Sequence, residues 1–221
     1  MQKSLITLFA VGIAGGYLTV PAFAETTGDS PLIVTKQLDR IAIDRLILKH
    51  TKVFTKLQPA MSTSLNLPKD FVGNYNRLLP DYSPEGMRLF QSTMRRSAER
   101  LAQMDLTNLS ADDKLHVQVN QVIDNYYAGS SEFSAGYIDT WGGHLPYIVS
   151  QIAGPLMDIP KVLQDQQNIS SIQDAQDYIE RLQVFAVVID QVNDNVKADA
   201  ANGIVLPKKL FPNTLKFLNG F

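Results

Sequence analysis

The chain has 221 residues, of which 45% are hydrophobic and 19% charged, and it carries a formal net charge of −2. This composition is typical of a folded globular protein with one good hydrophobic core. The charge balance gives no reason to expect binding to nucleic acid or to an anionic membrane. The sequence contains no cysteine, which excludes disulfides, thiolate zinc sites, a cysteine nucleophile and lipidation of a leading cysteine.

Residues 1–24 have the features of a cleavable signal peptide. Lys3 precedes an apolar stretch at 5–20, and the Ala-Phe-Ala at 22–24 matches an A-x-A cleavage site. The apolar stretch is short for a membrane-spanning helix, which needs about 20 residues; a retained anchor is the alternative. Cleavage would leave no membrane segment and would place the protein in the periplasm or outside the cell.

The rest of the chain, residues 35–221, is expected to form one mainly α domain, preceded by a flexible leader at 25–34. A first helix is predicted at 35–57, where apolar residues recur at helical spacing, and Pro59 ends it. Residues 59–82 contain several prolines and glycines and are expected to be irregular. The apolar face of the first helix comprises Ile43, Ile47, His50, Phe54 and Leu57.

Two further helices are each introduced by a capping serine. Ser83 is followed by proline and glutamate, which favour a helix start, and Ser110 begins a helix that runs to about Tyr127. The connection between the two helices is short, so they are expected to form an antiparallel hairpin. The predicted inward faces are Met87, Phe90, Met94, Ala98 and Leu101 in the first helix, and Leu115, Val119, Val122 and Tyr126 in the second.

The longest helix signal lies at 171–203. Either Ser170 with Gln173 or Ser171 with Asp174 can cap its start, and Gly203 is suited to its end. Residues 184–189 are nearly all apolar, which predicts that the middle of this helix is covered on most sides. We therefore predict a helical array organised around this long central helix. Its apolar stripe comprises Ala175, Tyr178, Leu182, Phe185, Ile189, Val192 and Val196.

Residues 129–168 lack a strong period and are predicted to form a long irregular loop, with one short extended piece at 147–152. A loop of this length is frequently a binding loop or a cover.

The three histidines do not form a metal-binding motif, because they lie in separate segments and none is followed by glutamate. His50 and His116 are interpreted as structural. His144 lies in a glycine-rich turn beside Trp141 and is the best candidate for a contact with a substrate or partner. The residues alone assign no catalytic group, no metal ligand and no cofactor to this chain.

Several short motifs resemble, in order, those of a bacterial family known as domain of unknown function eight hundred and eighty-five. The resemblance extends from about residue 36 to residue 210. The motifs are LLPDYSPE at 78–85, LSADD at 109–113, QIAGP at 151–155, DYIERL at 177–182 and ANGIVLP at 201–207.

The resemblance implies an exported helical protein similar to zinc peptidases of the thermolysin-motif kind. Family members are expected to be two to three times longer and to carry an H-E-x-x-H-type helix in their second half, which no position here matches. The chain would then be the amino-terminal, incomplete half of a larger zincin-like helical fold, inert without the rest. Its partners would be a peptide substrate or the missing carboxy-terminal half, and Arg181 could contact substrate or clamp the long helix with Tyr178. The alternative is a stand-alone exported binding or scaffold module.

Overall fold

The computed structural model describes residues 31–129, 137–140 and 143–220, with side chains from residue 40 onward. These residues form eight helices and two short strands, so the predicted mainly α fold is confirmed. The predicted signal peptide at 1–24 lies outside the described residues. The first described helix begins at Pro31, earlier than the expected start at 35. In the part of the chain that is described, no helix is both long and apolar enough to cross a bilayer.

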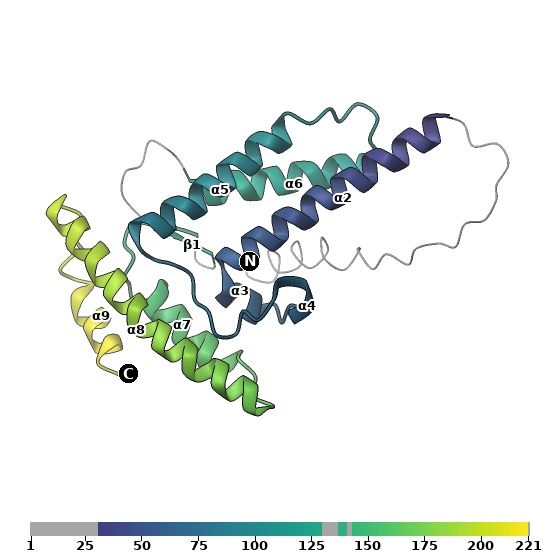
Figure 1. Cartoon of the computed structure of the whole chain (residues 1–221). Coiled ribbons are helices and arrows are strands. Elements are labelled where there is room, and N and C mark those ends of the chain that lie inside the picture. The colour runs from purple at the N-terminus through teal and green to yellow at the C-terminus, as the bar shows by residue number, and fades with distance from the viewer. Residues whose placement is uncertain (1–30, 130–136, 141–142, 221) are drawn as a thin grey trace.

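Three helices form the first layer of the molecule, as Figure 1 shows: α2 (Pro31–Leu57), α5 (Pro84–Ala102) and α6 (Ala111–Ala128). The predicted α5–α6 hairpin is confirmed, and α2 packs against both of its helices. One cluster in the core of this layer is rich in aromatic rings, with Phe54, Phe90 and Tyr127 in mutual contact. A second cluster is aliphatic and contains Ile43 and Val117.

The predicted caps are present in the structure. The hydroxyl of Ser83 accepts a hydrogen bond from the N–H of Gly86 at 3.0 Å. The hydroxyl of Ser110 accepts one from the N–H of Asp113 at 3.1 Å. A capping serine satisfies a backbone N–H that has no partner within the helix, which fixes where the helix begins.

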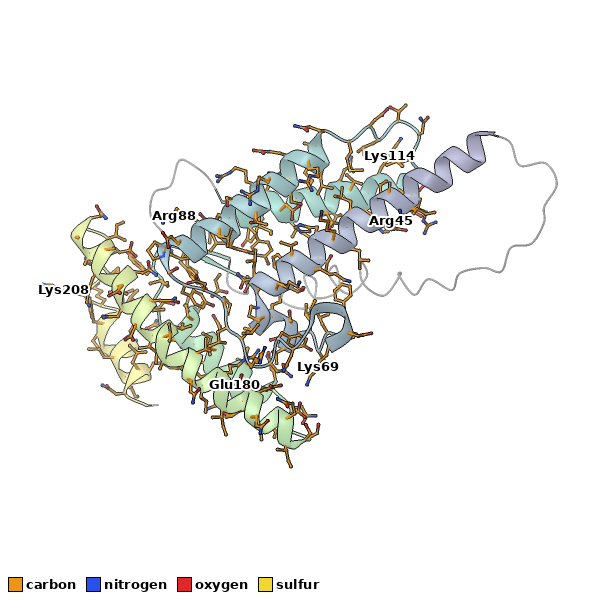
Figure 2. The ribbon with its side chains drawn as sticks, in the orientation of Figure 1. Arg45, Lys69, Arg88, Lys114, Glu180 and Lys208 are labelled. Atoms are coloured by element: carbon orange, nitrogen blue, oxygen red, sulfur yellow. The ribbon has the colours of Figure 1, made fainter. Side chains whose placement is uncertain are left out.

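The second layer contains α7 (Pro155–Asp165), α8 (Ile172–Ala201) and α9 (Phe211–Leu218). The long helix α8 lies along one side of the molecule in Figure 1 and packs against α7. Two short helices, α3 (Pro59–Ser64) and α4 (Lys69–Val72), join the layers and replace part of the expected irregular region. Lys69, labelled in Figure 2, ties α4 to the start of α8 through an ion pair with Asp174 at 3.1 Å.

The region expected to be one irregular loop contains regular structure. Strands β1 (Tyr137–Asp139) and β2 (Gly143–Leu145) pair antiparallel, with Tyr137 opposite Leu145, and α7 follows. The extended piece predicted at 147–152 is not a strand. Helix α7 was hidden from sequence reasoning because its two prolines resemble helix breakers, although Pro155 occupies the first turn, where it is tolerated.

The predicted inward face of α6 is wrong. Leu115, Val122 and Tyr126 are exposed, whereas Val117, Asp124 and Tyr127 are buried. The helix is turned so that Asp124 meets His50 of α2, with their side chains 2.7 Å apart. The buried side of α6 combines this polar contact with Val117 and Tyr127, which pack in the apolar clusters of the first layer.

The predicted face of α8 is also wrong in part. Val192 is buried as expected, but Leu182, Ile189 and Val196 are exposed, and so is the middle of the helix at Ala186. The residues that α8 turns inward are largely polar: Asp174, Asp177, Arg181 and Asn195, together with Val188 and Val192.

Candidate functional site

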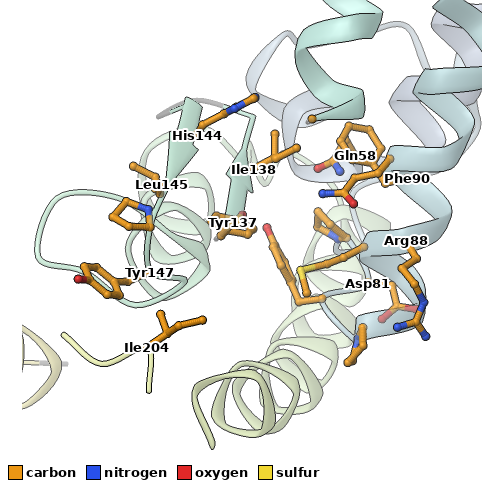
Figure 3. Close-up of a pocket in the computed structure, with 17 residues that line it drawn as sticks. Gln58, Asp81, Arg88, Phe90, Tyr137, Ile138, His144, Leu145, Tyr147 and Ile204 are labelled. Carbon is orange, nitrogen blue, oxygen red and sulfur yellow. The ribbon is translucent and has the colours of Figure 1, made fainter. Parts of the chain in front are cut away.

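A cavity of about 620 Å³ lies between the start of α5, the β-hairpin and the segment that follows β2. Figure 3 shows side chains from these distant segments converging on it. Its walls are mainly apolar and aromatic, with a few polar groups, which is the usual character of a small-molecule or side-chain binding site. The lining includes Gln58, Pro80, Asp81, Tyr82, Met87, Arg88, Phe90, Tyr137, Ile138, His144, Leu145, Tyr147 and Ile204.

Two buried tyrosines form the inner wall of the cavity. The rings of Tyr82 and Tyr137 lie 5.9 Å apart between centroids. The Tyr82 backbone is fixed by α8, since its N–H donates to Gln191 at 3.0 Å and its carbonyl accepts from Asn195 at 2.6 Å. Burial raises the pKa of both hydroxyls, so both are neutral across the physiological range. The wall can therefore offer aromatic faces and neutral hydroxyls, but not a tyrosinate base.

A pair of carboxyl groups lies behind this wall. Asp139 of β1 and Asp158 of α7 share a hydrogen bond, and both border a second cavity of only about 10 Å³ that Tyr82 and Tyr137 also line. Asp158 also accepts the N–H of Gly154 at 3.0 Å. Burial raises the pKa of the Asp158 carboxyl to about 7, and the hydrogen bond and charge of Asp139 act in the same direction. The pair therefore holds a proton near neutral pH.

This carboxyl pair predicts that stability depends on pH. In the folded chain the pKa of Asp158 is about 7, against 3.8 for an aspartate in the unfolded chain, so between these values the folded state binds more protons than the unfolded state. The free energy of unfolding should then fall as pH rises from about 4 to 7. The side chain at position 158 cannot ionise in the Asp158→Asn variant, so its free energy of unfolding should lose this dependence on pH. The difference in free energy of unfolding, variant minus unmodified chain, should be about 1–3 kcal/mol larger at pH 8 than at pH 4, after allowance for partial solvent screening.

Urea unfolding at several pH values measures this effect. Asp165→Asn is the matched control, because Asp165 is exposed at the end of the same helix. Parallel pH profiles for Asp158→Asn and the unmodified chain would contradict the shared proton.

The predicted contact residues fall in different places. His144 lines the cavity, where its Nε2 lies 2.7 Å from the carbonyl oxygen of Tyr126 and its ring stacks near the Tyr126 ring at 4.6 Å. Trp141 lies outside the described residues. Arg181 does not line the cavity and is fully buried. The contact role of all three residues stays a prediction.

Arg181 instead holds α8 to the chain segment that leads to the cavity. Its guanidinium donates to the carbonyl of Leu78 at 2.9 Å, to the side chain of Gln167 at 2.8 Å and to the carbonyl of Tyr75 at 2.6 Å. Burial lowers its pKa to about 10, so it stays charged at neutral pH. Arg181 therefore clamps α8 to the backbone at Tyr75 and Leu78. The pairing with Tyr178 suggested by the sequence stays a prediction, and Tyr178 packs against the apolar core of the second layer.

Sequence reasoning missed Tyr82, Tyr137, Asp139 and Asp158. Tyr82 lies within the family motif at 78–85, but no local motif marks the other three residues. The four come from three segments, before α5, in β1 and in α7, that only the folded chain brings together. His, Asp and Glu side chains in the described ranges do not form a group of three that could hold a metal ion.

The fold and cavity define a mainly helical protein with an aromatic-lined pocket between two layers. Residues 59–221 match the sequence profile of the family described as bacterial protein of unknown function, DUF885, and the chain belongs to this family. A search of curated proteins found no significant match.

A similar solved structure is the crystal structure of a protein from Colwellia psychrerythraea, named as a candidate lipoprotein. The two are 31% identical and superpose with a TM-score of 0.77 over 82% of this chain. This chain spans only 31% of the length of the Colwellia protein.

Proposed function

We propose that this chain is the amino-terminal, non-catalytic portion of an exported hydrolase similar to zinc metallopeptidases, and that it is inactive by itself. The observation that carries the proposal is the extent of the match: the family covers residues 59–221, yet the solved relative is far longer than the stretch it shares with this chain. In such a protein the zinc and its ligands would belong to the remaining portion, and this chain would need no cofactor of its own.

Two further observations support export. Residues 1–24 have the pattern of a signal peptide. The name of the Colwellia protein is that of a lipoprotein, a class of exported proteins. We place the protein in the periplasm or outside the cell, free of the membrane after cleavage.

The aromatic cavity would let this portion bind part of a peptide substrate, in addition to stabilising the catalytic portion. Its volume and its wall of Tyr82, Tyr137 and Phe90 suit an apolar or aromatic side chain of a peptide. Gln58, Arg88 and His144 supply polar groups that could hold the peptide backbone. The cavity would therefore help to position a substrate whose reacting bond lies on the catalytic portion.

The purified chain from residue 25 onward, supplied with zinc and a fluorogenic peptide pool, is expected to show no hydrolysis and no stoichiometric metal. A zinc enzyme needs the ion to lower the pKa of water and a base to move its proton. One zinc per chain together with turnover that a chelator abolishes would overturn the proposal. The genomic sequence downstream of Phe221 provides a second check, since a continuation that encodes H-E-x-x-H is expected.

A second candidate function is a stand-alone exported binding or scaffold module. The cavity favours it, because part of its lining comes from the 137–147 region, within the segment interpreted as a binding loop. A monomeric chain that binds aromatic peptides, from a gene that ends at residue 221, would favour this function over the first.

A further inference from the structure

Helix α8 departs from the usual arrangement of a helix at a protein surface on both its buried and its exposed side. Its inward side carries the fully buried Asp177 and Arg181 beside the apolar Val188 and Val192. Its outward side carries Ile179, Leu182, Ala186, Ile189 and Val196, which we call the outer face of α8. A surface helix normally exposes its charged residues and buries its apolar ones. An exposed apolar row of this kind is typical of a surface on which another element docks.

The outer face has the geometry of a helix-packing seam. Its residues follow one another at intervals of three, four, three and seven, which keeps them on one side of the helix. Ile179 is 56% exposed, and Leu182, Ile189 and Val196 are each at least 40% exposed. Side chains of this kind each contribute about 1.5–3 kcal/mol when they are fully covered, so a row of them forms a substantial docking surface.

We propose that the outer face of α8 is the docking surface for a helix from the portion of a family protein that lies outside the stretch shared with this chain. This inference rests on the proposed function. In the Colwellia protein that portion is more than two thirds of the chain, because the shared stretch is 31% of its length. The occupant presents an apolar stripe to Leu182, Ala186 and Ile189.

The charges beside the outer face favour a helix from the remaining portion over a second copy of this chain as the occupant. Glu180, labelled in Figure 2, lies with Asp190 and Asp194 along one flank of the face, and all three are exposed. Arg77 and Lys197 lie 3.8 Å and 3.5 Å from the first and third of these carboxylates, and no ion pair between described residues involves Asp190. Two antiparallel copies would bring these acidic flanks together. The flank instead suits an occupant with a lysine or arginine opposite Asp190.

The test compares the same change in two proteins. In this chain, Leu182→Gln combined with Ile189→Gln should leave the melting temperature within about 2 °C, because both side chains are already exposed. In the full-length Colwellia protein, glutamine at the two aligned positions should lower the melting temperature by about 5 °C or more, because covered apolar residues are lost. Serine at the positions aligned with Gln176 and Gln183, on the acidic flank, is the control and should have little effect.

Each result bears on the proposal. An unchanged melting temperature in the Colwellia protein would overturn it, as would polar residues at the aligned positions of its helix. Sedimentation that shows a dimer of this chain, abolished by the double substitution, would also overturn it in favour of a second copy. A lower melting temperature in the Colwellia variant does not depend on zinc or on hydrolysis. The docking inference can therefore hold where the proposed catalytic role fails, and the catalytic role can hold where the docking inference fails.

Discussion

Replacing Arg181 by methionine should lower the free energy of unfolding by about 3–5 kcal/mol, or prevent folding at 37 °C. The guanidinium is fully buried and satisfies two backbone carbonyls and the side chain of Gln167. Methionine has a similar volume but no donor, so these acceptors would be left buried and unpaired. The nearby carboxylate of Asp177, which is also fully buried, would lose its positive neighbour.

The loss of Arg181 should also loosen the wall of the candidate cavity. Arg181 anchors the segment at Tyr75 and Leu78 that continues to Tyr82 in the cavity wall. Arg181→Lys should also be destabilised, because one ammonium group cannot reproduce the planar fork that meets three acceptors. Urea unfolding at pH 7 measures both variants. Arg77→Met is the control, since its ion pair with Glu180 is half-exposed and should be worth less than about 1 kcal/mol. A loss below about 1 kcal/mol for Arg181→Met would show that water can replace the clamp.

The sequence was sufficient where apolar spacing and capping agree. Helix α5 begins after Ser83, and Phe90, Met94, Ala98 and Leu101 are buried as predicted. Local capping and hydrophobic burial favour the same orientation there, so one sequence window contains the information. The hairpin with α6 follows from the short connection.

The sequence was insufficient where polar groups set the packing. In α8, hydrogen bonds of Arg181 and Asn195 to distant backbone turn the helix away from its apolar stripe. Such partners lie about 100 residues away in the chain, so a periodicity argument cannot contain them. The cavity is hidden for the same reason, because its lining comes from segments spread over residues 58 to 204. The motifs at 78–85 and 201–207 supply part of the lining, but nothing in them shows that these segments meet. His144 was found only because glycine and tryptophan neighbours suggested an exposed turn.

A second buried polar contact joins all three helices of the first layer. His50 of α2 lies with Nε2 2.7 Å from Asp124 of α6 and with Nδ1 3.0 Å from the hydroxyl of Ser97 of α5. Neither of the two cavities described above is lined by these residues. Ser97 lies within α5, where backbone N–H groups are used in helix hydrogen bonds and cannot form an oxyanion hole. We therefore interpret the Ser–His–Asp group as structural.

The His50→Leu variant should lose about 3–5 kcal/mol of stability, because the fully buried Asp124 carboxyl group would lose the His50 ring nitrogen that lies 2.7 Å from it. Apart from this contact with His50, neither oxygen of the Asp124 carboxyl group has a hydrogen-bond partner within the described structure. The double variant His50→Leu with Asp124→Leu should be more stable than His50→Leu alone, since two apolar side chains replace the pair and no buried charge remains. Urea unfolding of both single variants and the double variant completes the cycle, with Ser97→Ala expected to cost about 1 kcal/mol or less. Strictly additive losses would show that His50 and Asp124 act independently.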